Sequence, residues 1–245
     1  MRGQRLVPGL IGLAVETNCV YYREMHRAAD EQLPGGHSLR SVMDTLDFAA
    51  LAGRVRAGDD AALAAAVAAS ARRVQDAGAD FAVISSNTGH LAAEAVRDAV
   101  TIPLLDIRDV AVRELRRRGA RQAGLISTSM SERAGLYDDA LAAAGIGLIS
   151  PDASEAAAVD EVIFAELVHG VASESGAATL QRVTDRLISR GADAVLLACT
   201  DLTLLAARLG PGSALVDTTV LHARAAGRQA VQGGQAVKGA HGSGR

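Results

Sequence analysis

GADFAVISSNT, at residues 78–88, and GADAVLLACTD, at residues 191–201, are two versions of one phrase, and together they decide the fold. Each begins with Gly-Ala-Asp, continues as the apolar run typical of a strand buried in a parallel sheet, and ends in small polar residues. Gly78 aligns with Gly191 and Ser86 with Cys199, with the same offset along the chain. One copy in each half of the chain predicts a duplicated α/β domain.

The rest of the chain alternates between strand-like and helix-like segments, which predicts an α/β protein with parallel sheets. Strands are expected at 6–13, 38–48, 81–85, 101–107, 123–127, 146–150, 194–198 and 214–219, and helices at 16–32, 59–77, 89–99, 108–118, 131–144, 155–169, 173–190, 201–209 and 220–231. We expect two pseudosymmetric Rossmann-like lobes. The N-terminal lobe takes residues 6–103 and 212–231, the C-terminal lobe takes 104–211, and the Gly-rich tail 232–245 is expected to be disordered.

Composition excludes several classes of protein. The net charge of -3 and the 2% aromatic content argue against a nucleic-acid partner. No apolar run of about 18 residues is present, so no membrane partner is expected. Two cysteines form no disulfide framework in a chain of 245 residues, which favours the cytoplasm. No His/Cys/Asp cluster has the spacing of a metal site.

Ser86 and Cys199 both follow the end of a predicted parallel strand. Ligands of open parallel sheets bind beyond the carboxyl ends of the strands, so these two residues are the first candidates for an active site. If the lobes face each other across a cleft, two side chains on opposite sides of a carbon can remove a proton from one face and return one to the other. Helix N-termini lower a thiol pKa, which predicts that Cys199 reacts with iodoacetamide near neutral pH.

A set of short motifs, in order along roughly residues 6–231, resembles the cofactor-independent aspartate/glutamate racemases. The motifs are GLIG, E-T-N and YYR within 9–23, GGHS at 35–38, DF at 47–48, NTGH at 87–90, T-x-x-S at 128–131, E-L-x-x-G at 166–170, the second repeat at 191–200 and DTT-x-x-HA at 217–223. The resemblance implies a site between two α/β lobes, an amino acid or dicarboxylate as substrate, no cofactor, no metal and a homodimer.

The resemblance also assigns residues to the site. The two cysteines typical of the family fall on Ser86 and Cys199, so both are catalytic candidates in a racemase that has only one thiol. Candidate substrate-binding residues are Asn87, Thr88, Thr128, Ser131, Thr200, Asp201 and His222. Ala158 stands where the family commonly has a lysine that holds a substrate carboxylate, which leaves the substrate open.

Other interpretations remain open from the residues alone. Asn87, Thr88 and Thr200 are also good helix caps, and Cys19 is expected to lie in the core. A single thiol also fits a decarboxylase or a cis–trans isomerase of the same superfamily, because one thiol delivers a proton to one face of a carbanion. A third possibility is a ligand-binding homologue without catalysis.

Overall fold

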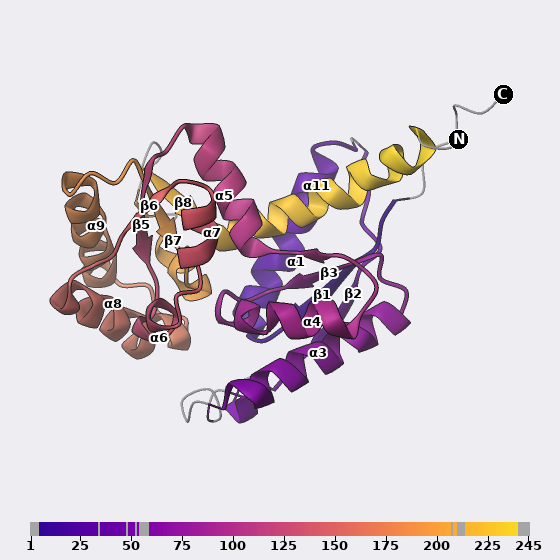
Figure 1. The fold of residues 1–245 in the computed structure, drawn as a ribbon, viewed down its shortest axis with the longest axis horizontal. Coiled ribbons are helices and arrows are strands. Elements are labelled where there is room, and N and C mark those ends of the chain that lie inside the picture. The colour runs from indigo at the N-terminus through magenta and orange to yellow at the C-terminus, as the bar shows by residue number, and fades with distance from the viewer. Residues whose placement is uncertain are drawn as a thin grey trace. The chain divides into compact units, whose positions relative to one another are not determined.

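The computed structural model describes residues 5–33, 35–47, 49–51, 53, 59–206, 208–209 and 214–239. The chain divides into two compact units. Unit 1 contains the described residues up to Asp106 and those from His222 onward, and unit 2 is Ile107–Leu221. Each unit contains one four-stranded, fully parallel sheet (Figure 1). The predicted α/β fold with two parallel sheets is confirmed.

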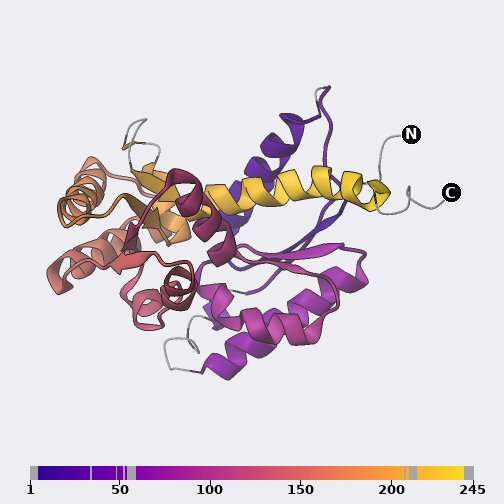
Figure 2. The ribbon, with the colours of Figure 1, turned by 45° about the horizontal axis from the view of Figure 1, so that its top comes forward.

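Unit 1 has the strand order β2-β1-β3-β4. Its elements are β1 (Pro8–Gly12), α1 (Val15–Asp30), β2 (Val42–Thr45), α3 (Asp60–Asp76), β3 (Phe81–Ile84), the 3-10 helix η1 (Thr88–Ala92), α4 (Ala93–Ala99), β4 (Leu104–Leu105) and most of α11 (Thr218–Gly239). Helices α3 and α4 pack on one face of the sheet through an aliphatic core, and α1 and α11 lie on the other (Figures 1 and 2). Strand β3 is buried along its whole length because helices cover both faces.

Unit 2 has the equivalent order β6-β5-β7-β8. Its elements are α5 (Ile107–Arg118), β5 (Gln122–Ile126), α6 (Ser129–Arg133), α7 (Asp138–Ala143), β6 (Gly147–Ile149), α8 (Ala153–Ala165), η2 (Leu167–His169), α9 (Glu174–Ser189), β7 (Ala194–Leu197), η3 (Thr200–Leu202), α10 (Thr203–Ala206), β8 (Leu215–Asp217) and the start of α11. One core lies under α8 and α9, and a second lies under α5 and α7. The two copies of the repeated phrase are therefore β3 and β7, the equivalent interior strands of the two sheets.

The glycine of each Gly-Ala-Asp phrase ends a helix. Gly78 follows α3 and Gly191 follows α9, with φ of 90° and 102°, a conformation that other residues rarely adopt. In both copies the amide of the next alanine bonds back to a carbonyl of the last helical turn. The same turn therefore directs the chain from helix to strand in both units.

The aspartate of each phrase fixes the start of the neighbouring strand. The Asp80 carboxylate accepts a hydrogen bond from the Val7 amide at 2.7 Å, just before β1. The Asp193 carboxylate accepts from the amides of Arg121 and Gln122 at 2.8 and 2.9 Å, at the start of β5. The shared first half of the phrase is therefore structural, and only its polar end differs in chemistry between the units.

Several expected boundaries are wrong. Strand β8 pairs with β7 and belongs to unit 2, although residues 212–231 were expected in the N-terminal lobe. The last helix continues to Gly239, so residues 232–239 are helical, and residues 240–245 lie outside the described residues. A Cβ at Gly233 would overlap the Leu6 side chain, so this glycine lets the helix continue in close contact with the chain before β1.

Two further expectations also differ from the structure. The helix expected at 131–144 is interrupted at Gly135, which has a φ of 61° and separates α6 from α7. Cys19 is exposed on α1, so the expectation that it lies in the core is wrong.

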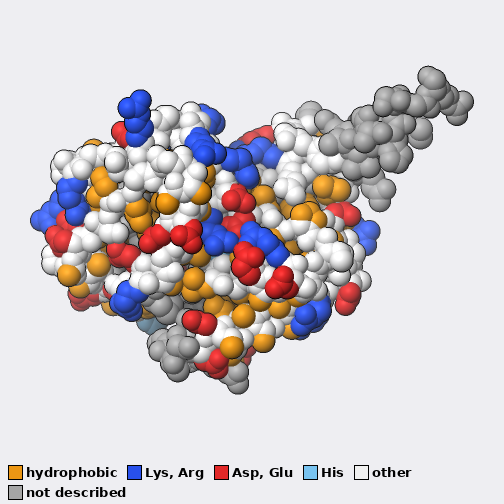
Figure 3. Space-filling view, viewed as in Figure 1, with side chains coloured by type: hydrophobic (Ala, Val, Ile, Leu, Met, Phe, Trp, Pro, Cys, Tyr) orange, Lys and Arg blue, Asp and Glu red, His pale blue; other side chains and the backbone are white. Residues whose placement is uncertain are grey.

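Basic and acidic side chains are interspersed over the face drawn in Figure 3, in line with the small net charge. None of the helices in the described part of the chain is long and apolar enough to cross a membrane.

Candidate active site

The loop after β3 presents Ser86. Its hydroxyl oxygen accepts a hydrogen bond from the Gly89 amide at 3.1 Å, which leaves the hydroxyl hydrogen to donate. Its carbonyl accepts a bond of 2.6 Å from Nδ1 of the buried His90, so this nitrogen carries the hydrogen. A Cβ at Gly89 would lie 2.7 Å from the Ile84 side chain, so glycine permits this tight turn. Ser86 is half-buried and held by its own loop.

Asn18 of α1 contacts the ends of three strands of unit 1, β1, β2 and β3. Its Oδ1 accepts from the Ser85 hydroxyl at 2.7 Å, and its Nδ2 donates to the Thr45 hydroxyl at 3.4 Å. A Cβ at Gly12 would overlap the Asn18 amide, so this close approach requires the glycine. The E-T-N motif contained this residue, but a helical asparagine gives no sign from sequence alone that it reaches two neighbouring strands.

His222 lies in the core of unit 1. Its Nε2 donates to the Leu105 carbonyl at 2.9 Å, because a carbonyl only accepts, and its Nδ1 shares a hydrogen bond of 2.8 Å with the Tyr21 hydroxyl. The His90 ring packs edge-on against the His222 ring, with the two ring centroids 5.4 Å apart. Both nitrogens of His222 are used within the protein, and the side chain is fully buried. In this structure His222 connects α11 to α1 and β4.

The loop after β7 presents Cys199. Its side chain is buried, with 9% of the residue exposed, and its Sγ lies 3.9 Å from Oδ2 of Asp201 at hydrogen-bond distance for sulfur. Cys199 has extended backbone angles and immediately precedes η3, so the amides of Asp201 and Leu202 contact the sulfur. A helix start therefore follows Cys199, as expected from the sequence, and its amides act to lower the pKa of the thiol.

The pKa of Cys199 is nevertheless raised, to about 12. Burial is the largest cause, and the Asp201 carboxylate adds to it, while the two amide contacts act in the opposite direction. The lowered pKa expected from the sequence is wrong for this structure, because desolvation outweighs the helix start. Burial also raises the pKa of Asp201, which makes the carboxylate beside the thiol a stronger base.

Thr128 and Ser131 lie together after β5, the strand that pairs with β7. The Thr128 hydroxyl donates to Oγ of Ser131 at 3.1 Å and accepts from the Ser131 amide at 3.3 Å. Between them, the Ser129 amide donates to Oδ1 of Asp160 on α8 at 3.0 Å. Sequence reasoning missed Asp160, because an acid in the middle of a helix has no motif of its own.

The remaining candidates belong to the same two loops. Asn87 is buried, while Thr88 and Thr200 are the half-buried first residues of η1 and η3. Ser86, Asn87 and Thr88 thus lie together in unit 1, and Cys199, Thr200 and Asp201 lie together in unit 2, beside the Thr128 loop. No group of three or more His, Cys, Asp or Glu side chains among the described residues can hold a metal ion.

Residues 10–226 match the Asp/Glu/Hydantoin racemase family. The chain belongs to this family. A putative Asp/Glu racemase from Yersinia pestis has 30% identity and a TM-score of 0.83, over 95% of this chain and 100% of that one. PH1733 of Pyrococcus horikoshii OT3, described as an aspartate racemase homologue, has 22% identity and a TM-score of 0.78, over 91% and 98% of the two chains.

Another relative is named for an activity. The broad specificity amino-acid racemase RacX of Bacillus subtilis is 24% identical over 62% of this chain and 65% of its own length. The chain thus spans slightly less than two thirds of that protein.

Proposed function

We propose that this protein is a cofactor-independent amino-acid racemase or epimerase that acts by removing and returning the proton on Cα. The observation that carries the proposal is the Cys199–Asp201 pair at the carboxyl end of β7. In this pair the thiol lies 3.9 Å from a carboxylate oxygen that can accept its proton. Family membership and the names of the relatives support amino acids as the substrate class.

In one direction, Asp201 takes the thiol proton and the resulting thiolate takes the Cα proton. The electron pair of the broken C–H bond moves into the substrate carboxylate, which becomes enediolate-like. The raised pKa of Asp201 helps this step, because it makes the carboxylate a stronger base. In the other direction, the Cys199 thiol gives its proton to the carbanion.

The opposite face of Cα needs a second proton carrier. We propose Ser86, or a water molecule bound to its hydroxyl, because that hydroxyl has a hydrogen to donate. Amides and hydroxyls would stabilise the developing charge, and the proposed groups are those of Asn87, Thr88, Thr128, Ser131 and Thr200.

The experiment is incubation of a panel of L- and D-amino acids in deuterium oxide, with mass and chirality followed together. We expect deuterium at Cα and inversion for at least one member of the panel. Ligand binding without exchange for any amino acid, unchanged in Cys199→Ala, would instead identify a non-catalytic binding protein.

A second candidate is favoured by the thiol itself. A buried, protonated Cys199 is suited to giving a proton to one face of a carbanion left after decarboxylation. Release of carbon dioxide from an aryl-substituted malonate, without exchange on amino acids, would favour that reaction. A cis–trans isomerase would be recognised by turnover of a cis-dicarboxylate such as maleate.

A further inference from the structure

Two negative groups act on the Cys199 thiol. Asp201 lies 3.9 Å from the sulfur. Asp160 is held at the end of β5 by its bond to the Ser129 amide, and its charge also raises the pKa of the thiol. Strands β5 and β7 are neighbours in the sheet, so both carboxylates lie at the edge where the thiol is.

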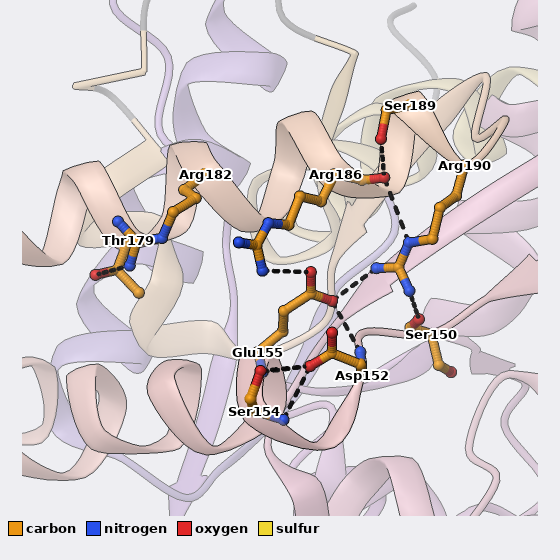
Figure 4. A network of polar contacts seen from close by, with 9 residues as sticks. All are labelled: Ser150, Asp152, Ser154, Glu155, Thr179, Arg182, Arg186, Ser189 and Arg190. Carbon is orange, nitrogen blue, oxygen red and sulfur yellow. Dashed lines mark hydrogen bonds and ion pairs between the residues drawn. The ribbon is translucent and has the colours of Figure 1, made fainter.

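Two arginines of α9 pair with Glu155 of α8. Arg186 and Arg190 donate to Glu155 at 3.2 and 2.7 Å, and Arg190 also donates to the Ser150 carbonyl (Figure 4). Glu155 lies in the first turn of α8, whereas Asp160 lies farther along the helix beside the end of β5. Within the described part of the chain, no ion pair neutralises Asp160.

We propose that Asp160 is a specificity-determining residue that makes the site prefer amino acids with a basic side chain over aspartate and glutamate. A carboxylate beside the reacting thiol attracts an ammonium or guanidinium group and repels a second carboxylate. Ala158 on the same helix offers no cation to a substrate carboxylate. This inference rests on the proposed function, because it assigns a substrate class to the same site.

The test compares kcat/KM for Cα deuterium exchange with lysine, arginine, aspartate, glutamate and methionine, in the wild type and in Asp160→Asn. We expect lysine or arginine to exceed glutamate at least about tenfold in the wild type. In Asp160→Asn this ratio falls at least about fivefold, with methionine as the uncharged reference. Ratios within one variant do not depend on the fraction of active protein.

Asp185→Asn is the matched control. Asp185 is exposed on α9, where it accepts from Gln181, and its neutralisation leaves the ratio unchanged. Exchange fastest with aspartate or glutamate, or a ratio unaltered in Asp160→Asn, would overturn this inference and leave the proposed function standing. No exchange with any amino acid would overturn the proposed function itself, and this inference with it.

Discussion

The loops after β3 and β7 have the same scaffold and different chemistry. In both units a glycine turn and an aspartate lead into a buried interior strand. At the strand end, Ser86 is half-buried and tied to its own loop, whereas Cys199 is buried and paired with a carboxylate. The two units therefore share the strand and the groups that support it, and they differ in the residue at the strand end.

The largest expected effect tests which loop carries the chemistry. Cys199→Ala removes the only thiol at the two strand ends, and we expect Cα exchange to fall by about 10³-fold. Ser86→Ala removes one hydrogen-bonding hydroxyl, and we expect a loss of about tenfold. Initial rates of deuterium uptake measure both. Equal losses would contradict the assigned asymmetry.

Replacing Ser86 with cysteine makes the two loops more alike. A thiol is a better proton carrier than a hydroxyl, so we expect Ser86→Cys to raise exchange by roughly tenfold for the less reactive enantiomer. The faster enantiomer serves as the reference within the same protein. Unchanged rates for both enantiomers would show that the Ser86 hydroxyl does not limit the reaction.

The environment of Cys199 is tested by alkylation without substrate. At neutral pH we expect slow modification by iodoacetamide, because the pKa of this thiol is about 12. Asp201→Asn removes a nearby negative charge, lowers that pKa and raises the rate roughly tenfold. Peptide mass mapping separates Cys199 from the exposed Cys19, which serves as an internal control. Rapid modification of Cys199 in the wild type at pH 7 would contradict its burial.

The smallest expected effects are decreases in stability on replacing the aspartates of the repeated phrase, Asp80 and Asp193. We expect Asp80→Ala and Asp193→Ala each to lower stability, with the larger decrease for Asp193, which accepts two amides instead of one. Those amides lower the pKa of Asp193, so its contribution is present above about pH 4 and is lost as the pH falls below that value. Denaturant midpoints at pH 7 and pH 3 measure both effects. A midpoint for Asp193→Ala equal to wild type at pH 7 would show that the carboxylate has no role in strand placement.

The sequence predicted the parallel sheets and the position of the strand-end residues, because apolar runs and helix-ending glycines are local signals. It placed Ser86 and Cys199 correctly after β3 and β7. The strand at 214–219 was assigned to the wrong lobe, because its partner β7 is defined only by pairing between distant residues.

The electrostatics of the site could not be predicted in the same way. The helix start beside Cys199 is visible in the sequence and favours a lowered pKa. The burial of Cys199 arises from tertiary packing and reverses the direction of the pKa shift, and the approach of Asp160 from α8 adds a smaller contribution of the same sign. Asn18 was missed for a similar reason, since its contacts with Ser85 and Thr45 reach the ends of two strands that are distant in the sequence, β3 and β2.

The central claim is that the protein moves the Cα proton of an amino acid with one thiol and one hydroxyl. The most direct measurement follows deuterium uptake from solvent into the separate L and D forms of the best substrate. The account predicts uptake and inversion from both enantiomers at unequal initial rates, since the two faces are served by different groups. Absence of Cα deuterium in both enantiomers of every amino acid on the panel would contradict it.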